Sequence, residues 1–248
     1  MIKPAVLDPQ EEATVVGRVF DVPLVVKGRT WLPLTQLVAW PIMAWVAKRR
    51  LSSRTWRQSL GVGALTMLIA LGSEWCHNLA HAAAGWMIRK PMDAIRIIWG
   101  MPLLVYYDIN DAGVTPQEHI FRALGGPVFN VLVLPFALML RLVSPARSWL
   151  RDIANVAAAT NIFLPLVGLL PIPGLDGGPI LKWSLVERGQ SVQDADRTVR
   201  KVNGLLGIVL ALGGLFSFKK RRFVIGGLCV QLALIALSIA LGIFKEQE

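Results

Sequence analysis

One stretch decides the fold: LGSEWCHNLAH, residues 71–81, lies inside an apolar block that runs from about residue 60 to residue 88. A block of this length suffices to cross a bilayer, which takes about 20 mostly apolar residues in a helix. Glu74, His77 and His81 are ionisable, and ionisable side chains inside a spanning helix are costly and mark functional positions. The stretch therefore predicts a transmembrane helix that carries polar chemistry.

The rest of the chain also has the character of a membrane protein. Its 248 residues are 54% hydrophobic and 17% charged, with a mean hydropathy of +0.53, whereas a soluble protein is about a quarter charged. Five further blocks come close to spanning length, at about residues 31–46, 120–143, 153–171, 202–218 and 223–244. We predict an all-α polytopic membrane protein of about six transmembrane helices.

Two short segments have strand character instead. Residues 14–26 and 95–107 are rich in β-branched and aromatic residues around turn formers, which predicts two short β-hairpins at the membrane surface. The expected organisation is an N-terminal surface segment, residues 1–30, followed by a single membrane domain, residues 31–248. The core of the polar site is expected between about residues 58 and 183.

The basic residues indicate contact with lipids. The net charge is +10, and its clusters, such as residues 48–50 and 219–222, flank apolar blocks. Anionic lipid headgroups are therefore the expected partners, and nucleic acid is not. Lys and Arg are nearly equal in alternate loops, so the orientation stays open, as does the oligomeric state.

His77 and His81 lie one helical turn apart, so both imidazoles can reach one ion. Their partner is sought in LLPIPGLDGG, residues 169–178, where prolines and glycines break an apolar helix at membrane depth. Backbone of that kind survives in a membrane only when it is buried in protein or lines a cavity. Asp176 in this break would complete the three-ligand set of a catalytic zinc ion. The alternatives are histidines that hydrogen-bond across helices and an aspartate that caps a helix.

Three elements together resemble a known family. HNLAH at residues 77–81, GGPVFN at 125–130 and LLPIPGLDGG at 169–178 are similar to elements of the site-2 proteases, which are intramembrane zinc metallopeptidases. That family carries His-Glu-x-x-His, Gly-Pro-x-x-Asn and Leu-Pro-x-Pro-x-Leu-Asp-Gly-Gly. The resemblance covers about residues 15–183 and implies that His77, His81 and Asp176 bind zinc. It further implies a transmembrane or membrane-proximal protein segment as substrate. We expect a multi-pass protein of a prokaryotic cell membrane.

Two departures from the family pattern put the activity in question. Asn78 stands where the family has its general-base Glu, and an amide cannot accept a proton near neutral pH. Gly168 stands where many members have an Asn, although Asn161 remains two turns earlier. Glu74, one turn before Asn78, is the alternative base. The rival interpretations are a non-catalytic member that binds and regulates transmembrane partners, and a metal or proton carrier.

Overall fold

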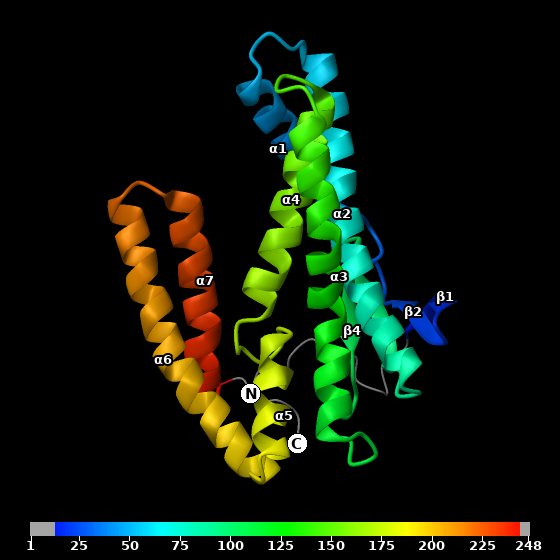
Figure 1. Ribbon diagram of the computed structural model, residues 1–248, viewed down its shortest axis with the longest axis vertical. Helices are drawn as coiled ribbons and strands as arrows, with labels where there is room; N and C mark the ends of the chain where they lie inside the picture. The colour runs from blue at the N-terminus through cyan, green and yellow to red at the C-terminus, as the bar shows by residue number, and fades with distance from the viewer. Residues whose placement is uncertain (1–12, 244–248) are drawn as a thin grey trace. The chain divides into compact units, whose positions relative to one another are not determined.

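The computed structural model describes residues 13–243. Within this range the helices and strands follow one another in the order shown in Figure 1. They are β1 (Thr14–Val19), β2 (Val22–Val26), α1 (Leu34–Arg50), α2 (Trp56–Met87), β3 (Ala94–Ile98), β4 (Met101–Val105), α3 (Pro116–Val143), α4 (Trp149–Gly168), α5 (Gly177–Glu187), α6 (Val192–Lys219) and α7 (Phe223–Ala240). The chain is mostly helical, as predicted.

The chain divides into two compact units. The first comprises residues 13–107 and 124–168 and contains the four strands, α1, α2, α4 and most of α3. The second comprises residues 108–123 and 169–243 and contains α5, α6, α7 and the N-terminal end of α3.

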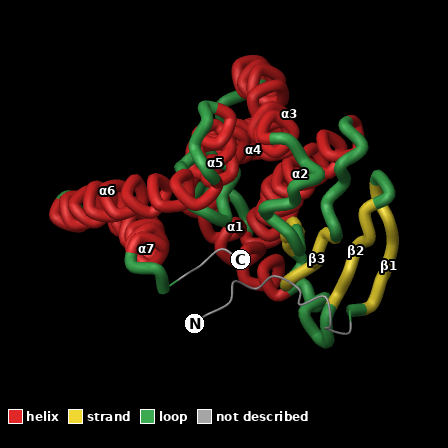
Figure 2. Tube along the Cα trace, turned by 90° about the horizontal axis from the view of Figure 1, so that it is seen from below, coloured by secondary structure: helices red, strands yellow, loops and turns green. Residues whose placement is uncertain are grey.

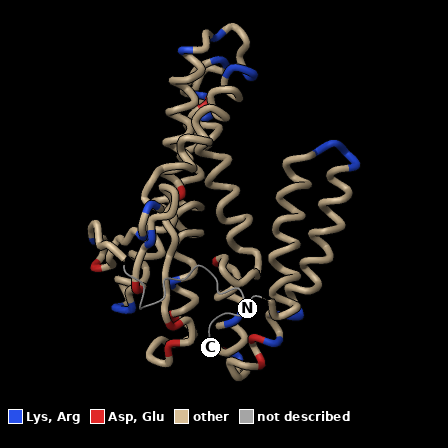
Figure 3. Tube along the Cα trace, turned by 180° about the vertical axis from the view of Figure 1, so that it is seen from behind, with Lys and Arg blue, Asp and Glu red and all other residues tan. Residues whose placement is uncertain are grey.

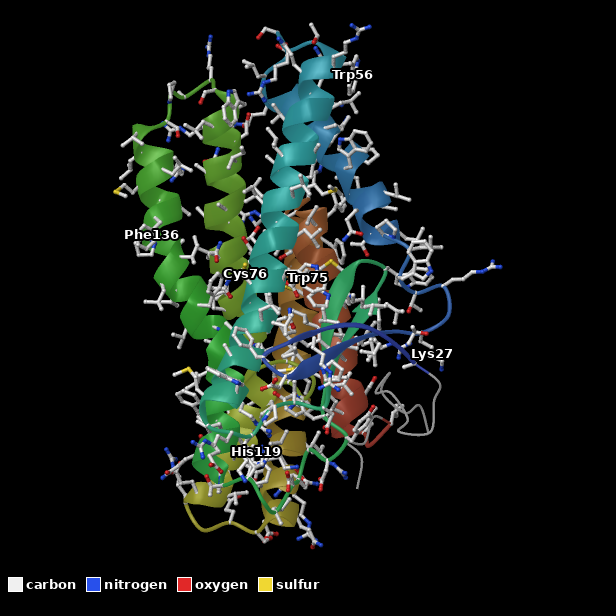
Figure 4. All side chains as sticks on the ribbon, turned by 90° about the vertical axis from the view of Figure 1, so that its right-hand side faces the viewer. Lys27, Trp56, Trp75, Cys76, His119 and Phe136 are labelled. Carbon is white, nitrogen blue, oxygen red and sulfur yellow. The ribbon has the colours of Figure 1, made fainter. Side chains whose placement is uncertain are left out.

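Among residues 13–243, four helices are long and apolar enough to cross a membrane: α2, α3, α6 and α7. Large apolar side chains on their outer surfaces are exposed, such as Phe136 on α3 (Figure 4). The chain is therefore an integral membrane protein. The other two predicted spans correspond to α1, which has only 17 residues, and α4, whose apolar sequence is interrupted by Asn155 and Asn161.

Helix α2 has well-defined ends. Thr55 and Gln58 form a capping box, in which Thr55 Oγ1 accepts from the Gln58 backbone N–H at 3.2 Å and Gln58 Oε1 accepts from the Thr55 N–H at 2.9 Å. This arrangement satisfies backbone donors that the first turn leaves without partners. At the other end Arg89 adopts a positive φ of 58° and stops the helix. Glu74, His77 and His81 thus lie in the C-terminal half of one continuous helix.

The strands form one sheet rather than two separate hairpins. Its order is β1-β2-β3-β4, and the two expected hairpins, β1–β2 and β3–β4, are joined by a parallel pairing of β2 with β3 (Figure 2). Val22 and Ile95 are fully buried and pack with Ala82 of α2. Trp75 of α2 donates from Nε1 to the Gly100 carbonyl at 3.1 Å (Figure 4). The sheet therefore rests on the helix that carries the histidines.

The second unit is built on the helical hairpin of α6 and α7. Gly214 approaches α7 so closely that an added Cβ would lie 3.2 Å from the Gly226 carbonyl oxygen, and small residues allow such close helix contact in membranes. The turn between the two helices holds the basic cluster at residues 219–222 (Figure 3). Asn203 of α6 donates to the Pro171 carbonyl at 2.8 Å. This hydrogen bond connects the non-helical segment between α4 and α5, residues 169–176, to the hairpin.

Candidate metal centre

His77 and His81 face the interior of the first unit from α2. Their side chains are buried, with 7% and 2% of their surface exposed. The rings meet edge to face with their centroids 4.8 Å apart, and the two Nε2 atoms lie 3.2 Å from each other. The helical spacing thus brings both imidazoles to one point, as the sequence predicts.

This separation fits a shared metal ion. Two nitrogens that each lie about 2.0–2.1 Å from a tetrahedral zinc ion are about 3.3 Å apart. A direct N–H···N hydrogen bond between neutral rings would have a similar length. The distance between the two Nε2 atoms therefore fits either a shared zinc ion or a direct hydrogen bond between the rings. Measuring the metal content of the protein distinguishes these two arrangements.

Two asparagines of α3 and α4 lie behind His77. Its Nδ1 is 2.6 Å from Oδ1 of Asn130, and Asn130 Nδ2 donates to Oδ1 of Asn161 at 2.8 Å. Both amides are buried, with 0% and 1% of their surface exposed. Sequence reasoning identified no partner for the outer ring nitrogens. The signal that could have found Asn130 is the Gly-Pro-x-x-Asn element, in which it occupies the last position.

Two glycines of α3 let that helix approach the histidines. A Cβ on Gly126 would lie 2.4 Å from His81 Nε2 and 2.6 Å from His77 Nε2, directly against both potential ligand atoms. A Cβ on Gly125 would lie 2.6 Å from the Ala80 carbonyl oxygen. The Gly126 N–H points at His81 Nδ1 across 3.4 Å, a long contact for a hydrogen bond.

Asn78 is buried beside the two histidines but directs its amide along its own helix. Its Nδ2 donates to the Glu74 carbonyl at 2.9 Å and to Glu74 Oε1 at 3.2 Å. Glu74 is half-buried. The two predicted catalytic residues therefore contact each other, one turn apart on α2.

Asp176 lies in the second unit, at the start of α5. It occupies the N-cap position, yet its side chain makes no capping hydrogen bond to the helix. Gly177 and Gly178 pack against the preceding turn, where added Cβ atoms would lie 2.3 Å from the Leu169 carbonyl oxygen and 2.6 Å from that of Ile172. The double glycine thus allows the broken segment to fold back tightly just before the short helix α5, which the sequence did not predict.

The third histidine, His119, has a packing role. His119 is buried in the first turns of α3 (Figure 4). Its ring stacks on Trp183 with the centroids 3.8 Å apart and the planes at 2°. The residue that caps α3 is Thr115, whose Oγ1 accepts from the Glu118 N–H at 3.3 Å. Cys76, on the surface of α2, is exposed.

Comparison with known proteins finds a relative in sequence and similar solved structures. No family model matches the chain. Over 71 residues, 29% of this chain, it is 37% identical to a protein of Methanocaldococcus jannaschii named "Putative zinc metalloprotease MJ0611". The chain spans about 37% of the length of that relative.

The structural match extends over nearly the whole chain. The solved site-2 protease from Methanocaldococcus jannaschii superposes with a TM-score of 0.54, at 12% sequence identity, over 96% of this chain and 97% of that one. At this identity the likeness establishes the fold. The fold that the three sequence elements predict is therefore confirmed: this chain is a membrane protein with the fold of the solved site-2 protease.

Proposed function

We propose that this chain is a site-2-protease-like intramembrane zinc metalloendopeptidase that acts on membrane-embedded or membrane-proximal segments of other proteins. His77, His81 and Asp176 would hold one zinc ion. The observation that carries the proposal is the pair of buried imidazoles on α2, whose Nε2 atoms meet at 3.2 Å inside a membrane-spanning helix. The name of the M. jannaschii relative supports zinc as the metal.

The residues of the chain would divide the work as follows. When bound, zinc supplies Lewis-acid chemistry, because it polarises a carbonyl group and makes water nucleophilic near neutral pH. His77 and His81 would hold it on α2, and Asp176 would hold it from the segment between α4 and α5. Asn78 cannot move a proton, and a positioned general base contributes about 10²- to 10⁴-fold. We therefore propose that hydrolysis is slow.

The contact between Asn78 and Glu74 favours a second candidate function. The amide donates to the only nearby carboxylate on α2, and Gly168 offers no side chain that could stabilise an oxyanion. A chain with this site could bind a transmembrane segment of a partner protein and hold or regulate it without cleavage. In that case the metal would serve as a structural brace.

The membrane arrangement belongs to the same proposal. Helices α1 and α4 pack along α2 in the first unit, and Gly63 of α2 is so close to α1 that an added Cβ would lie 2.5 Å from the Ala44 backbone nitrogen. The packing of both helices along α2 supports α1 and α4 as the remaining two of six spans. We propose a single membrane domain, residues 31–248, after a surface segment of residues 1–30; residues 1–12 and 244–248 of these ranges lie outside the described part of the chain. We place it in a prokaryotic cell membrane, with anionic lipids as neighbours.

The test combines metal content with cleavage. The detergent-solubilised full chain is purified, its zinc is measured per chain, and it is incubated with a single transmembrane-helix substrate. Zinc near one per chain with slow cleavage supports the peptidase, and zinc without cleavage supports the binding function. A chain that neither retains nor takes up zinc would contradict both.

A further inference from the structure

The amide of Asn161 has a fixed orientation. Its Nδ2 lies 2.8 Å from the Ala157 carbonyl oxygen and 3.2 Å from Ser73 Oγ. Ser73 Oγ donates its own proton to the Ile69 carbonyl at 3.0 Å. Both neighbours of Asn161 Nδ2 are therefore acceptors, and the reversed amide would set its oxygen against a carbonyl oxygen.

This orientation determines that of the next amide. Since Asn161 Nδ2 faces Ala157 and Ser73, Asn161 Oδ1 faces Asn130 at 2.8 Å. An amide oxygen only accepts, so the atom of Asn130 at that distance must be its Nδ2. The Oδ1 atom of Asn130 is then the one that lies 2.6 Å from His77 Nδ1.

The orientation of the two amides thus determines which ring nitrogen of His77 carries a proton. Its Nδ1 faces an oxygen that can only accept, so Nδ1 must carry a proton and donate it. In a neutral imidazole the lone pair then resides on Nε2, the atom that faces His81. Burial of both amides leaves little room for water to replace either partner.

We infer that Asn161 is a positioning residue for the metal centre, acting through Asn130 to select the tautomer of His77 that presents its Nε2 lone pair to zinc. This inference rests on the proposed function, because the His77 tautomer matters to zinc only if His77 is a zinc ligand. A ligand histidine generally donates its other N–H to an outer partner, and loss of such a partner costs about 10- to 100-fold in metal affinity. Here the outer partner is itself oriented by a residue on another helix.

Asn130→Asp distinguishes orientation from packing. A carboxylate offers only acceptors whichever way it turns, so Asp at position 130 holds the same His77 tautomer without help from Asn161. Asn161→Ala alone should therefore weaken zinc binding by about 10-fold or more, whereas Asn161→Ala on the Asn130→Asp background should leave the affinity near that of Asn130→Asp. Asn155→Ala is the matched control, since Asn155 lies on the same helix and bonds Arg141 at the surface.

The experiment measures zinc affinity of the detergent-solubilised full chain by competition with a chelating dye, with thermal unfolding as the check on folding. Solid-state ¹⁵N NMR of the metal-free, histidine-labelled wild type reports the tautomer of His77 directly, with the signal assigned by His77→Gln. Protonated Nδ1 and a rescued double variant are the expected results. Protonated Nε2 in the wild type would overturn the inference even if Asn161→Ala failed to fold.

Two further outcomes are informative. An equal loss of affinity with and without Asn130→Asp would mean that Asn161 only packs, which contradicts the inference and leaves the proposed function intact. A wild type that binds no zinc would remove the proposed function, while the NMR spectrum would still decide whether the two asparagines set the tautomer.

Discussion

The amide nitrogen of Asn78 lies 3.2 Å from the Oε1 atom of Glu74, one turn earlier on α2, and 2.9 Å from the Glu74 carbonyl oxygen. The side chain at the family's general-base position thus acts as a hydrogen-bond donor to the only carboxylate nearby on the same helix. A general base must have an oxygen that can accept a proton. The hydrogen bond from Asn78 occupies Oε1 of Glu74, one of the two oxygens that could do so. If the chain is a peptidase as proposed, we expect its activity to depend on both residues.

Asn78→Glu should raise cleavage of a transmembrane substrate by at least about 10²-fold, the lower end of what a positioned general base supplies. The substitution restores a carboxylate beside the two histidines. The assay is cleavage by the wild type and the variant at equal zinc content. No gain, with zinc retained in both, would favour the non-catalytic function.

Glu74→Gln tests whether Glu74 already acts as the base. If the slow activity of the wild type depends on this carboxylate, the variant should lose it entirely while retaining zinc, because an amide cannot accept the proton. Cleavage that is present in the wild type and insensitive to this substitution would leave our account of the missing base without support.

Asp176→Ala should reduce zinc occupancy sharply, because two imidazoles alone leave a zinc site one protein ligand short. His119→Ala is the control, since His119 stacks on Trp183 and is not an expected ligand. Zinc per chain is measured by elemental analysis after dialysis. Equal retention in the two variants would contradict the ligand assignment.

Gly126→Ala should abolish zinc binding even if the chain folds. The added Cβ would lie within 2.6 Å of the Nε2 atoms of both His77 and His81, so at least one ring must turn away. Gly72→Ala on α2 is the control, because an added Cβ there meets nothing within 4 Å. The comparison uses the same dye competition, and normal affinity in Gly126→Ala would exclude the space between the rings as the metal position.

Asp152→Ala should lower the free energy of unfolding by about 3 kcal/mol. Asp152 is buried and pairs with Arg50 and Arg54, and the Arg54 guanidinium, which is also buried, would lose its counter-ion. Arg197→Ala removes only an exposed pair with Asp194 and should cost less than about 1 kcal/mol. Unfolding in detergent, followed by circular dichroism, compares the two, and similar losses would argue against the buried pair.

Much of the site could be predicted from sequence because it depends on local geometry. The α-helical period alone places His77 and His81 on one face, whatever the surrounding fold. Helix α4 ends before the segment at residues 169–176, because proline lacks the N–H that a helix needs and glycine permits the positive φ of 89° seen at Gly174. The apolar blocks predicted the long spanning helices because hydropathy is also a property of a single segment.

Local sequence pattern also explains where the predicted helix boundaries differ from those in the structure. The predicted start of the fifth span near residue 202 followed hydropathy, yet α6 begins at Val192, where Ser191 Oγ accepts from the Asp194 N–H at 3.1 Å. Hydropathy identifies the part of a helix that suits lipid, whereas capping decides where the helix begins. Helix α5 escaped prediction because its sequence directly follows the break and is too short to give a spanning signal.

Other features required the tertiary structure, because they join residues that are distant along the chain. The pairing of Leu24 with Ile95, which unites two predicted hairpins in one sheet, and the tie from Asn161 through Asn130 to His77 both link separate elements. Side-chain alternation and helical period are properties of one segment and say nothing about which segment it meets. The sequence alone determined the chemical groups on α2, and packing of α3 and α4 against it decided which atoms those groups present.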